Sequence, residues 1–315
     1  MAPVTHARPR LVLGTRGSKL AVCQSEWVQA KLKELAPEVD VTLRRIQTSG
    51  DKILDVPLAK IGGKGLFVKE IEEALLQGDI DLAVHSMKDV PAELQPGLAL
   101  LCVPRREDPR DALISRDARP FKDLPPGARI GTSSLRRQAQ LLRVRPDFSI
   151  EMLRGNLDTR LRKLREGQYD AIVLAAAGLR RLGWAKEITE LLDFETCLPA
   201  IGQGALGIEG REDDDFVRSL LSGLEDRETR TTVMAERALL RRLQGGCQVP
   251  IAAHATMDGS RLSIDALVAG LDGKDLIRER AEGAVEEAES LGVRVGERVL
   301  ARGGDRILQS IYGKA

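Results

Sequence analysis

The residues around one cysteine of this sequence predict a thiol that is accessible for chemistry. In "LQGGCQVP", residues 243–250, Cys247 follows two glycines and precedes Pro250. We expect Gly245 to end a helix in a left-handed conformation and Gly246 to remove steric bulk, while Pro250 prevents the helix from resuming. The pattern predicts a thiol exposed on a loop. An ordinary loop cysteine is the alternative that these residues leave open.

A carboxylate stands in an equally suggestive place. Asp89 follows the apolar run of "DLAVHSMKD", at the carboxyl end of an expected strand. A general acid or base is often placed there, but Asp89 beside Lys88 is also typical of a solvated ion pair. His85 of the same stretch is more typical of a packed or hydrogen-bonded histidine than of a catalyst.

Positive charge is concentrated in one segment. Between residues 129 and 165, nine arginines and one lysine stand against three acidic residues. Arg136 and Arg137 begin an expected helix after "GTSS", and Arg154 ends an expected strand in "FSIEMLRGN". Ligands of doubly wound sheets bind at strand carboxyl ends and helix N-termini. The first half of the chain offers a matching set: Arg16, Ser18, Lys64 and Lys88.

Arginine forks bind carboxylates or phosphates through two parallel hydrogen bonds. The whole set therefore predicts a ligand with many anionic groups, held between two halves of the molecule. Arg143, Arg162 and Arg165 are instead expected on solvated helix faces.

Composition excludes several classes of protein. Lys and Arg number 48 against 47 Asp and Glu, so the net charge indicates no nucleic-acid partner. No apolar run approaches the roughly 18 residues of a membrane span, and the start of the sequence has no signal-peptide core. Four scattered cysteines and three histidines argue against a disulfide framework or a zinc site. We expect a soluble, cytoplasmic protein without metal.

Alternating strand and helix patterns predict α/β architecture with mostly parallel sheets. "LLQGDIDLAVHS" and "LREGQYDAIVLAAAG" correspond, as do "VLGTRGS" and "RIGTSSL", so the chain contains two similarly built α/β halves. From about residue 226 the pattern changes to a helix, two Asp-Gly turns between alternating runs, and a final helix, which predicts an α+β domain with a three-stranded antiparallel sheet. The expected domains are 1–104 plus about 200–222, 105–199, and 226–315.

Together these stretches resemble the porphobilinogen deaminase (hydroxymethylbilane synthase) family. The resemblance extends over essentially the whole chain in order and is carried most specifically by "HSMKD", "SSLRRQ" and "GGCQVP". It implies three domains, of which the first two are like the lobes of a periplasmic binding protein, with the active cleft between them. Gly17 and Gly210 depart from the family's pattern without affecting the assignment.

The resemblance implies a transferase of tetrapyrrole and heme biosynthesis. Such enzymes carry a dipyrromethane cofactor joined by a thioether to the cysteine of "GGCQVP", here Cys247. They condense four porphobilinogen molecules head to tail, each with loss of ammonia, and hydrolysis releases hydroxymethylbilane. Asp89 would be the central catalyst, protonating the leaving amine and stabilising the cationic azafulvene that remains. A cytoplasmic monomer without nucleic-acid or membrane partners is expected.

The resemblance also implies binding roles. The residues that would bind the cofactor are Lys88, Thr132, Ser134, Arg136, Arg137, Gly155 and Arg160. The residues that would bind substrate are Arg16, Ser18, Lys64, Phe67, Arg154, Arg160 and Gln203, with Lys64 and Phe67 on a loop over the cleft.

Two other hypotheses stay open on the residues alone. A two-lobed anion-binding protein without chemistry would carry no covalent adduct. Nucleic-acid binding would need aromatic residues among the arginines for base stacking, and Phe148 is the single aromatic residue between 129 and 165.

Overall fold

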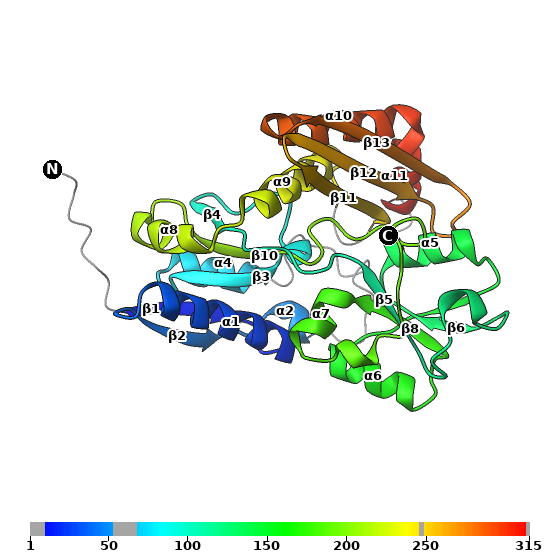
Figure 1. Cartoon of the computed structure of the whole chain (residues 1–315), viewed down its shortest axis with the longest axis horizontal. Helices are drawn as coiled ribbons and strands as arrows, with labels where there is room; N and C mark the ends of the chain where they lie inside the picture. Colours follow the sequence, from blue (N-terminus) through cyan, green and yellow to red (C-terminus); the bar gives the residue numbers. More distant parts are fainter. Residues whose placement is uncertain (1–9, 53–67, 246–248, 313–315) are drawn as a thin grey trace.

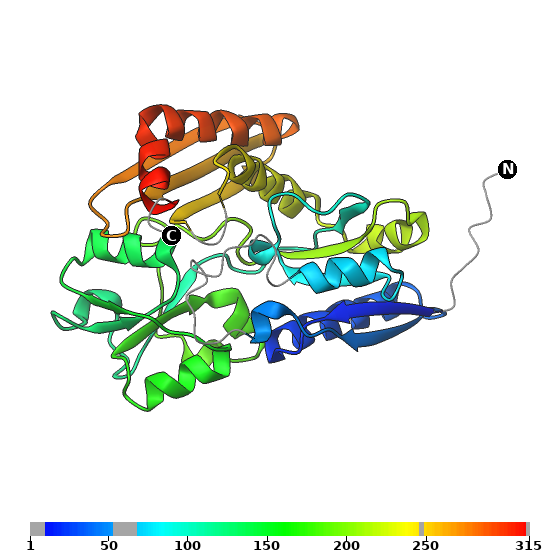
Figure 2. The same ribbon diagram turned by 180° about the vertical axis from the view of Figure 1, so that it is seen from behind.

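The computed structural model describes residues 10–52, 68–245 and 249–312. Two α/β lobes lie side by side, and a third domain lies across their junction in both views (Figures 1 and 2). None of the helices in these ranges is long and apolar enough to cross a bilayer.

The first lobe is built on a five-stranded sheet with the order β2-β1-β3-β10-β4. Its strands are β1 (Arg10–Thr15), β2 (Asp40–Arg45), β3 (Leu82–Ser86), β4 (Leu98–Cys102) and β10 (Leu206–Arg211). The helices and short helical turns of this lobe are α1 (Lys19–Leu35), α2 (Ser49–Lys52), α4 (Lys69–Leu76), η1 (Met87–Asp89), α8 (Asp215–Leu221) and η4 (Ser222–Leu224). β1 pairs in parallel with β2 and β3, whereas β10 runs antiparallel to β3 and β4.

The second lobe repeats this plan, with the order β7-β6-β8-β5-β9. Its strands are β5 (Asp111–Ser115), β6 (Arg129–Gly131), β7 (Ser149–Glu151), β8 (Ala171–Ala175) and β9 (Glu190–Leu191). Its helices and turns are η2 (Phe121–Asp123), α5 (Leu135–Val144), α6 (Leu157–Arg165), α7 (Ala176–Arg181) and η3 (Ala185–Glu187). Here β5 is the strand that runs antiparallel to its neighbours β8 and β9.

The reversed strand of each sheet has one physical origin. The chain passes from the first lobe to the second through residues 103–110, the first crossing segment, and returns through residues 192–205, the second crossing segment. β5 and β10 are the strands that follow these crossings, so each enters its sheet from the junction and runs against the strands beside it. The predicted mostly parallel sheets are confirmed, with one antiparallel strand in the fourth place of each.

The third domain has the predicted three-stranded antiparallel sheet, in the order β11-β12-β13. Its elements are α9 (Arg227–Arg242), β11 (Ile251–Asp258), β12 (Arg261–Ala269), β13 (Leu276–Ala284), η5 (Val285–Glu287), α10 (Ala288–Val299), η6 (Leu300–Gly304) and α11 (Asp305–Tyr312). One face of the sheet packs under α9 and α10 around Leu239, Ile264 and Leu291. On the other face Leu267 packs against Ala139 of α5, which ties the domain to the second lobe.

Two local expectations were wrong. The strand expected over "FSIEMLRGN" ends at Glu151, because β7 is an edge strand whose partner β6 offers three residues for pairing; Arg154 therefore lies beyond the sheet. After α9, the left-handed residue is Gln244, with φ of 51°, and not Gly245. Gly245 is needed for space, since a Cβ there would lie 2.3 Å from Ile251 Cδ1.

Candidate active site

The first lobe contributes the loop after β1 and the turn after β3. Ser18 caps α1, as the sequence predicted, by accepting a hydrogen bond of 3.3 Å from Ala21 N. Asp89 ends η1, directly after β3. Together with Arg16 and His85, these two residues line a small cavity of about 60 Å³. The structure thus brings Arg16 and Ser18 together with Asp89, which lies far from them in the sequence.

The second lobe contributes the N-terminus of α5. Ser134 is its N-cap and accepts from Arg137 N at 3.5 Å, and Thr132 Oγ1 accepts from Ser134 N at 3.1 Å. This capping places Arg136 and Arg137 on the first turn of the helix, where both side chains are buried.

The turn between β7 and α6 brings a further arginine toward this region. Gly155 has φ of +111°, a conformation that L-residues with a side chain rarely adopt. Its carbonyl accepts a hydrogen bond of 2.7 Å from Arg160 Nε. An added Cβ at Gly155 would lie 2.7 Å from Thr159 Cγ2, so both backbone angle and space require glycine at this turn.

Charges from both lobes act on one another. Burial lowers the pKa of Lys88 to about 8, with Asp89 and Asp111 opposing and Arg136 and Arg137 reinforcing the shift. This lysine of the first lobe therefore lies within electrostatic reach of the second-lobe arginines.

An arginine of the second lobe shows the same electrostatic influence of both lobes. Burial also lowers the pKa of Arg160 to about 10, reinforced by Arg137 and Arg154 and opposed by Asp89. The two lobes thus enclose one shared cationic region that includes Asp89.

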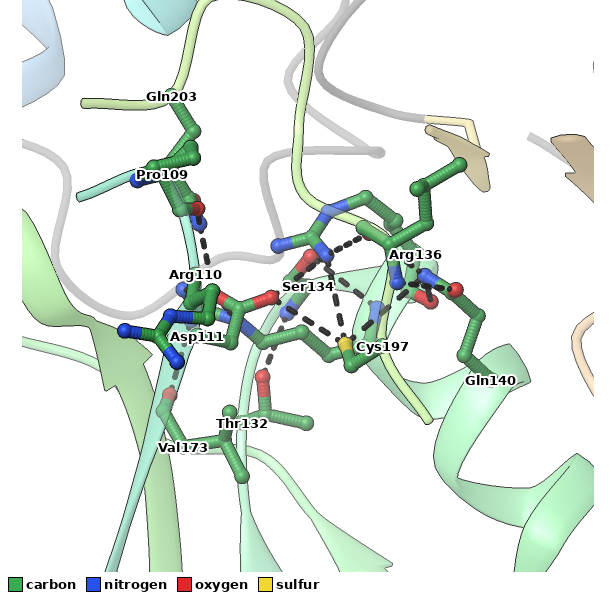
Figure 3. Close-up of polar contacts among 12 residues, drawn as sticks. Pro109, Arg110, Asp111, Thr132, Ser134, Arg136, Gln140, Val173, Cys197 and Gln203 are labelled. Atoms are coloured by element: carbon green, nitrogen blue, oxygen red, sulfur yellow. Dashed lines mark hydrogen bonds and ion pairs between the residues drawn. The ribbon is translucent and has the colours of Figure 1, made fainter. Parts of the chain in front are cut away.

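Asp111, which the sequence analysis did not select, accepts hydrogen bonds from the two buried arginines of this region (Figure 3). It begins β5, and its side chain is fully buried. Oδ2 accepts from Arg136 Nη1 at 2.7 Å and from Cys197 Sγ at 3.2 Å. Oδ1 accepts from Arg137 Nη2 at 2.7 Å and Arg137 Nε at 3.0 Å. It also accepts from Gln203 Nε2 at 3.0 Å.

We call these five residues the Asp111 cluster. Burial opposes ionisation of Asp111, but Arg136 and Arg137 outweigh it and hold the pKa of the carboxyl far below its ordinary value. Burial and then Asp111 raise the pKa of the Cys197 thiol to about 12, which leaves it uncharged. The one sequence signal for Asp111 was an acidic residue directly before the apolar run "ALIS".

Gln203 connects the two lobes instead of lying open to a ligand. It is 1% exposed and belongs to the second crossing segment. Besides its bond to Asp111, its Nε2 donates to Pro109 O at 2.7 Å, and its Oε1 lies 3.5 Å from the donor Lys88 Nζ. Its amide therefore contacts the first crossing segment and residues of both lobes.

Several other expectations can be compared with the structure. His85 is buried and lies 2.8 Å from Glu209 through Nε2 and Oε2, as expected of a packed histidine. The exposed side chains of Arg162 and Arg165 pair with surface carboxylates, also as expected. The predicted roles of Lys64, Phe67 and Cys247 fall outside the described residues.

Within the described ranges no group of three or more potential ligands is arranged to hold a metal ion.

Comparison with known proteins decides which chemistry this arrangement serves. The family description "Porphobilinogen deaminase, dipyromethane cofactor binding domain" matches residues 11–219, and "Porphobilinogen deaminase, C-terminal domain" matches residues 230–301. This chain belongs to the porphobilinogen deaminase family. It is thus a transferase of tetrapyrrole biosynthesis that polymerises porphobilinogen and uses a dipyrromethane cofactor. Nearly the whole chain takes part in the match.

Individual relatives agree. The porphobilinogen deaminase of Syntrophotalea carbinolica is 60% identical over 301 residues, which cover 96% of each chain. That of Pelobacter propionicus is 56% identical over 303 residues, 96% of this chain and 97% of the relative.

Solved structures were also compared. They include an arginine-specific periplasmic binding protein of Salmonella typhimurium, with a TM-score of 0.42 and 14% identity over 71% of this chain and 94% of that one. The aliphatic sulphonate binding protein of Escherichia coli gives a TM-score of 0.41 and 15% identity over 76% and 71%. Likeness at this level bears on neither ligand nor activity.

Proposed function

We propose that the cationic region between the lobes holds the carboxylates of the dipyrromethane cofactor, that Cys247 carries this cofactor through a thioether, and that Asp89 is the catalytic residue. One observation carries the proposal: half-buried cations from both lobes, Lys88 and Arg160, both interact electrostatically with Asp89, and burial disfavours their charged forms. Lys88 and Arg160 both have a lowered pKa for this reason. An anion between them would offset that penalty.

The donor set fits the cofactor. A dipyrromethane made from two porphobilinogen units carries two acetates and two propionates. Carboxylates of this kind are bound best by guanidinium and ammonium groups. The Nε of buried Arg136 has no hydrogen-bond partner among the described residues and suits such an acceptor. The residues that would hold the cofactor are Lys88, Thr132, Ser134, Arg136, Arg137, Gly155 and Arg160. When bound, the cofactor supplies the primer that is extended.

Substrate would lie beside this primer, against Asp89. The residues proposed to bind its carboxylates or cover it are Arg16, Ser18, Lys64, Phe67, Arg154, Arg160 and Gln203. Gln203 is the least direct of them, because its amide is already engaged with Asp111 and Pro109. Its contribution would come through Lys88.

Asp89 would act on the proton and on the developing charge. Its carboxyl group gives a proton to the substrate's amine, the carbon–nitrogen bond breaks and ammonia leaves. The carboxylate then stabilises the cation left on the substrate's methylene carbon. After the new carbon–carbon bond forms, the proton displaced from the pyrrole carbon returns to Asp89, so atoms and charge balance. General acid–base catalysis of this kind contributes about 10²–10⁴-fold.

Intact-mass measurement of the purified chain tests the attachment. We expect the polypeptide mass plus one dipyrromethane, and a coloured product with an acidic aldehyde reagent for pyrroles. Cys247→Ser should abolish the adduct, whereas Cys23→Ser, at a half-buried cysteine of α1, should retain it. An unchanged adduct in Cys247→Ser would exclude that residue.

Asp89→Asn tests the catalytic role. It should retain the cofactor mass yet lose turnover by about 10²–10⁴-fold, because the amide can neither supply the proton nor oppose the cation. Steady-state release of hydroxymethylbilane from porphobilinogen measures this. Turnover at the wild-type rate would contradict the role of Asp89.

We further propose that the chain works as a monomer in the cytoplasm, without a nucleic-acid partner. The balanced charge of 48 basic and 47 acidic residues supports the last point. Light scattering coupled to size-exclusion chromatography tests the monomer, since a dimer would have twice the mass of one chain.

A further inference from the structure

The Asp111 cluster includes the two arginines, Arg136 and Arg137, that the proposed function assigns to cofactor binding. Asp111 itself is 0% exposed, and its two oxygens are occupied by donors from α5 and from the second crossing segment. Such a residue touches neither substrate nor cofactor. Its effect on the reaction must come from what it does to its neighbours.

The two arginines are held in different ways. Arg137 gives Nε and Nη2 to Asp111 Oδ1, and its Nη1 donates to Val173 O at 2.8 Å. All three of its guanidinium nitrogens are therefore engaged.

Arg136 is held by one end of its guanidinium. Nη1 donates to Asp111 Oδ2 at 2.7 Å and to Leu198 O at 2.6 Å. Its Nε is buried and has no hydrogen-bond partner among the described residues. The side of the guanidinium that carries Nε is the side suited to two parallel bonds with a carboxylate.

We propose that Asp111 is a positioning residue, which fixes Arg136 and Arg137 so that the Nε side of Arg136 is presented to a cofactor carboxylate. This inference rests on the proposed function. Fixing a planar guanidinium in advance lowers the entropy lost when a carboxylate binds.

A carboxylate is required at this position for an electrostatic reason. Two buried guanidinium groups repel each other, and a single negative charge between them offsets that repulsion while leaving a net positive charge for the ligand. An amide in its place would offer one acceptor oxygen and would direct an N–H₂ group toward guanidinium donors. The arginines would then lose their fixed orientation.

The test uses Asp111→Asn, which is nearly the same size as the native side chain. Chains free of cofactor are incubated with porphobilinogen, and the adduct is followed by intact mass. We expect assembly to be slower by about tenfold, the loss of roughly one charge-assisted hydrogen bond. The matched control is Glu236→Gln, which removes a second buried carboxylate that pairs with an arginine outside the proposed site. It should lower the melting temperature yet assemble the cofactor at the wild-type rate per folded molecule.

Asp111→Glu keeps the negative charge but displaces the carboxylate, and it serves where Asp111→Asn does not fold. Slowed assembly in a folded Asp111 variant, with normal assembly in Glu236→Gln, supports positioning. Wild-type assembly rates in the folded Asp111 variants overturn it, as does equal slowing in the control. If the wild-type chain itself forms no adduct, the proposed function fails; if the wild-type and Asp111 variants form it equally well, only this inference fails.

Discussion

Two buried carboxylates near the crossing segments invite comparison. Glu236 of α9, like Asp111, is fully buried and pairs with arginine. Its Oε1 accepts from Arg106 Nη1 at 2.6 Å and from Ala255 N at 2.9 Å. Its Oε2 accepts from Gly202 N at 2.7 Å. Arg106 Nε donates to Gln203 O at 2.8 Å. Glu236 thus joins the third domain to both crossing segments.

The two sites differ in whether every nitrogen of the paired guanidinium has a hydrogen-bond acceptor. At Glu236 each nitrogen of the Arg106 guanidinium has an acceptor, since Nη2 also reaches Oε2 at 3.2 Å. At Asp111 the Nε of Arg136 has none among the described residues. A buried donor without a partner costs stability, and a ligand carboxylate that accepted a hydrogen bond from this Nε would offset that cost. The same residue types therefore form an internally satisfied ion pair at Glu236 and, in the proposed function, part of the cofactor-binding site at Asp111.

The largest effect should come from breaking the buried ion pair between Glu236 and Arg106. Glu236→Ala leaves the Arg106 charge and two backbone N–H groups buried without their acceptor, and we expect a loss of about 3–5 kcal/mol in the free energy of unfolding. Urea denaturation followed by circular dichroism measures it. The folded fraction should still assemble cofactor normally. A loss below about 1 kcal/mol would mean that water replaces the carboxylate, and that the Glu236–Arg106 pair contributes little to the free energy of unfolding.

Acid should weaken both clusters. Burial opposes ionisation of Glu236, but Arg106 and His254 outweigh it and lower the pKa of the carboxyl to about 2. A depressed carboxyl pKa gives stability that is present above the unfolded-state value of 4.5 and lost as pH falls toward the folded-state value. We expect the free energy of unfolding to fall between about pH 5 and pH 2. Glu236→Gln should show a flatter decline in denaturation curves at successive pH values, and equal slopes would contradict the assignment.

Features that depend on neighbouring residues could be predicted from the sequence, whereas the contacts of Asp111 could not. Alternating strands and helices, the Ser18 cap and the Asp-Gly turn at Gly259 depend on neighbouring residues, and the structure has all of them. Asp111 was missed because its partners lie far along the chain, on α5 and in the second crossing segment. Those partners meet only because β5 runs antiparallel to β8, a reversal that the regular alternation of elements did not indicate.

The sequence predicted where Arg136 and Arg137 lie, but it could not predict which of their nitrogens are hydrogen-bonded. Their positions after turns correctly placed Arg136 and Arg137 at the start of α5. No local pattern could show that the guanidinium of Arg137 has all of its nitrogens engaged, while the Nε of Arg136 has no acceptor in the part of the chain that the structure describes. That distinction depends on carbonyl groups such as those of Val173 and Leu198, which packing brings to the cluster.

The smallest effect that we expect concerns Lys88, and it is specific to the site. With its pKa lowered by burial to about 8, the amine of the cofactor-free chain loses its charge as pH rises through that value. Between pH 7 and pH 9 the protonated fraction falls about tenfold. If Lys88 attracts a cofactor carboxylate, the rate of cofactor assembly should fall several-fold over this range.

Lys88→Arg isolates this contribution, because guanidinium keeps its charge at these pH values. Adduct formation in the arginine variant should vary less between pH 7 and pH 9 than in the wild-type chain. Other groups, including the amine of porphobilinogen, titrate alike in both chains and cancel in the comparison. Identical pH profiles would remove Lys88 from the proposed binding set and leave Arg136 of the Asp111 cluster, whose charge does not change in this range, as the principal cation proposed to bind the cofactor.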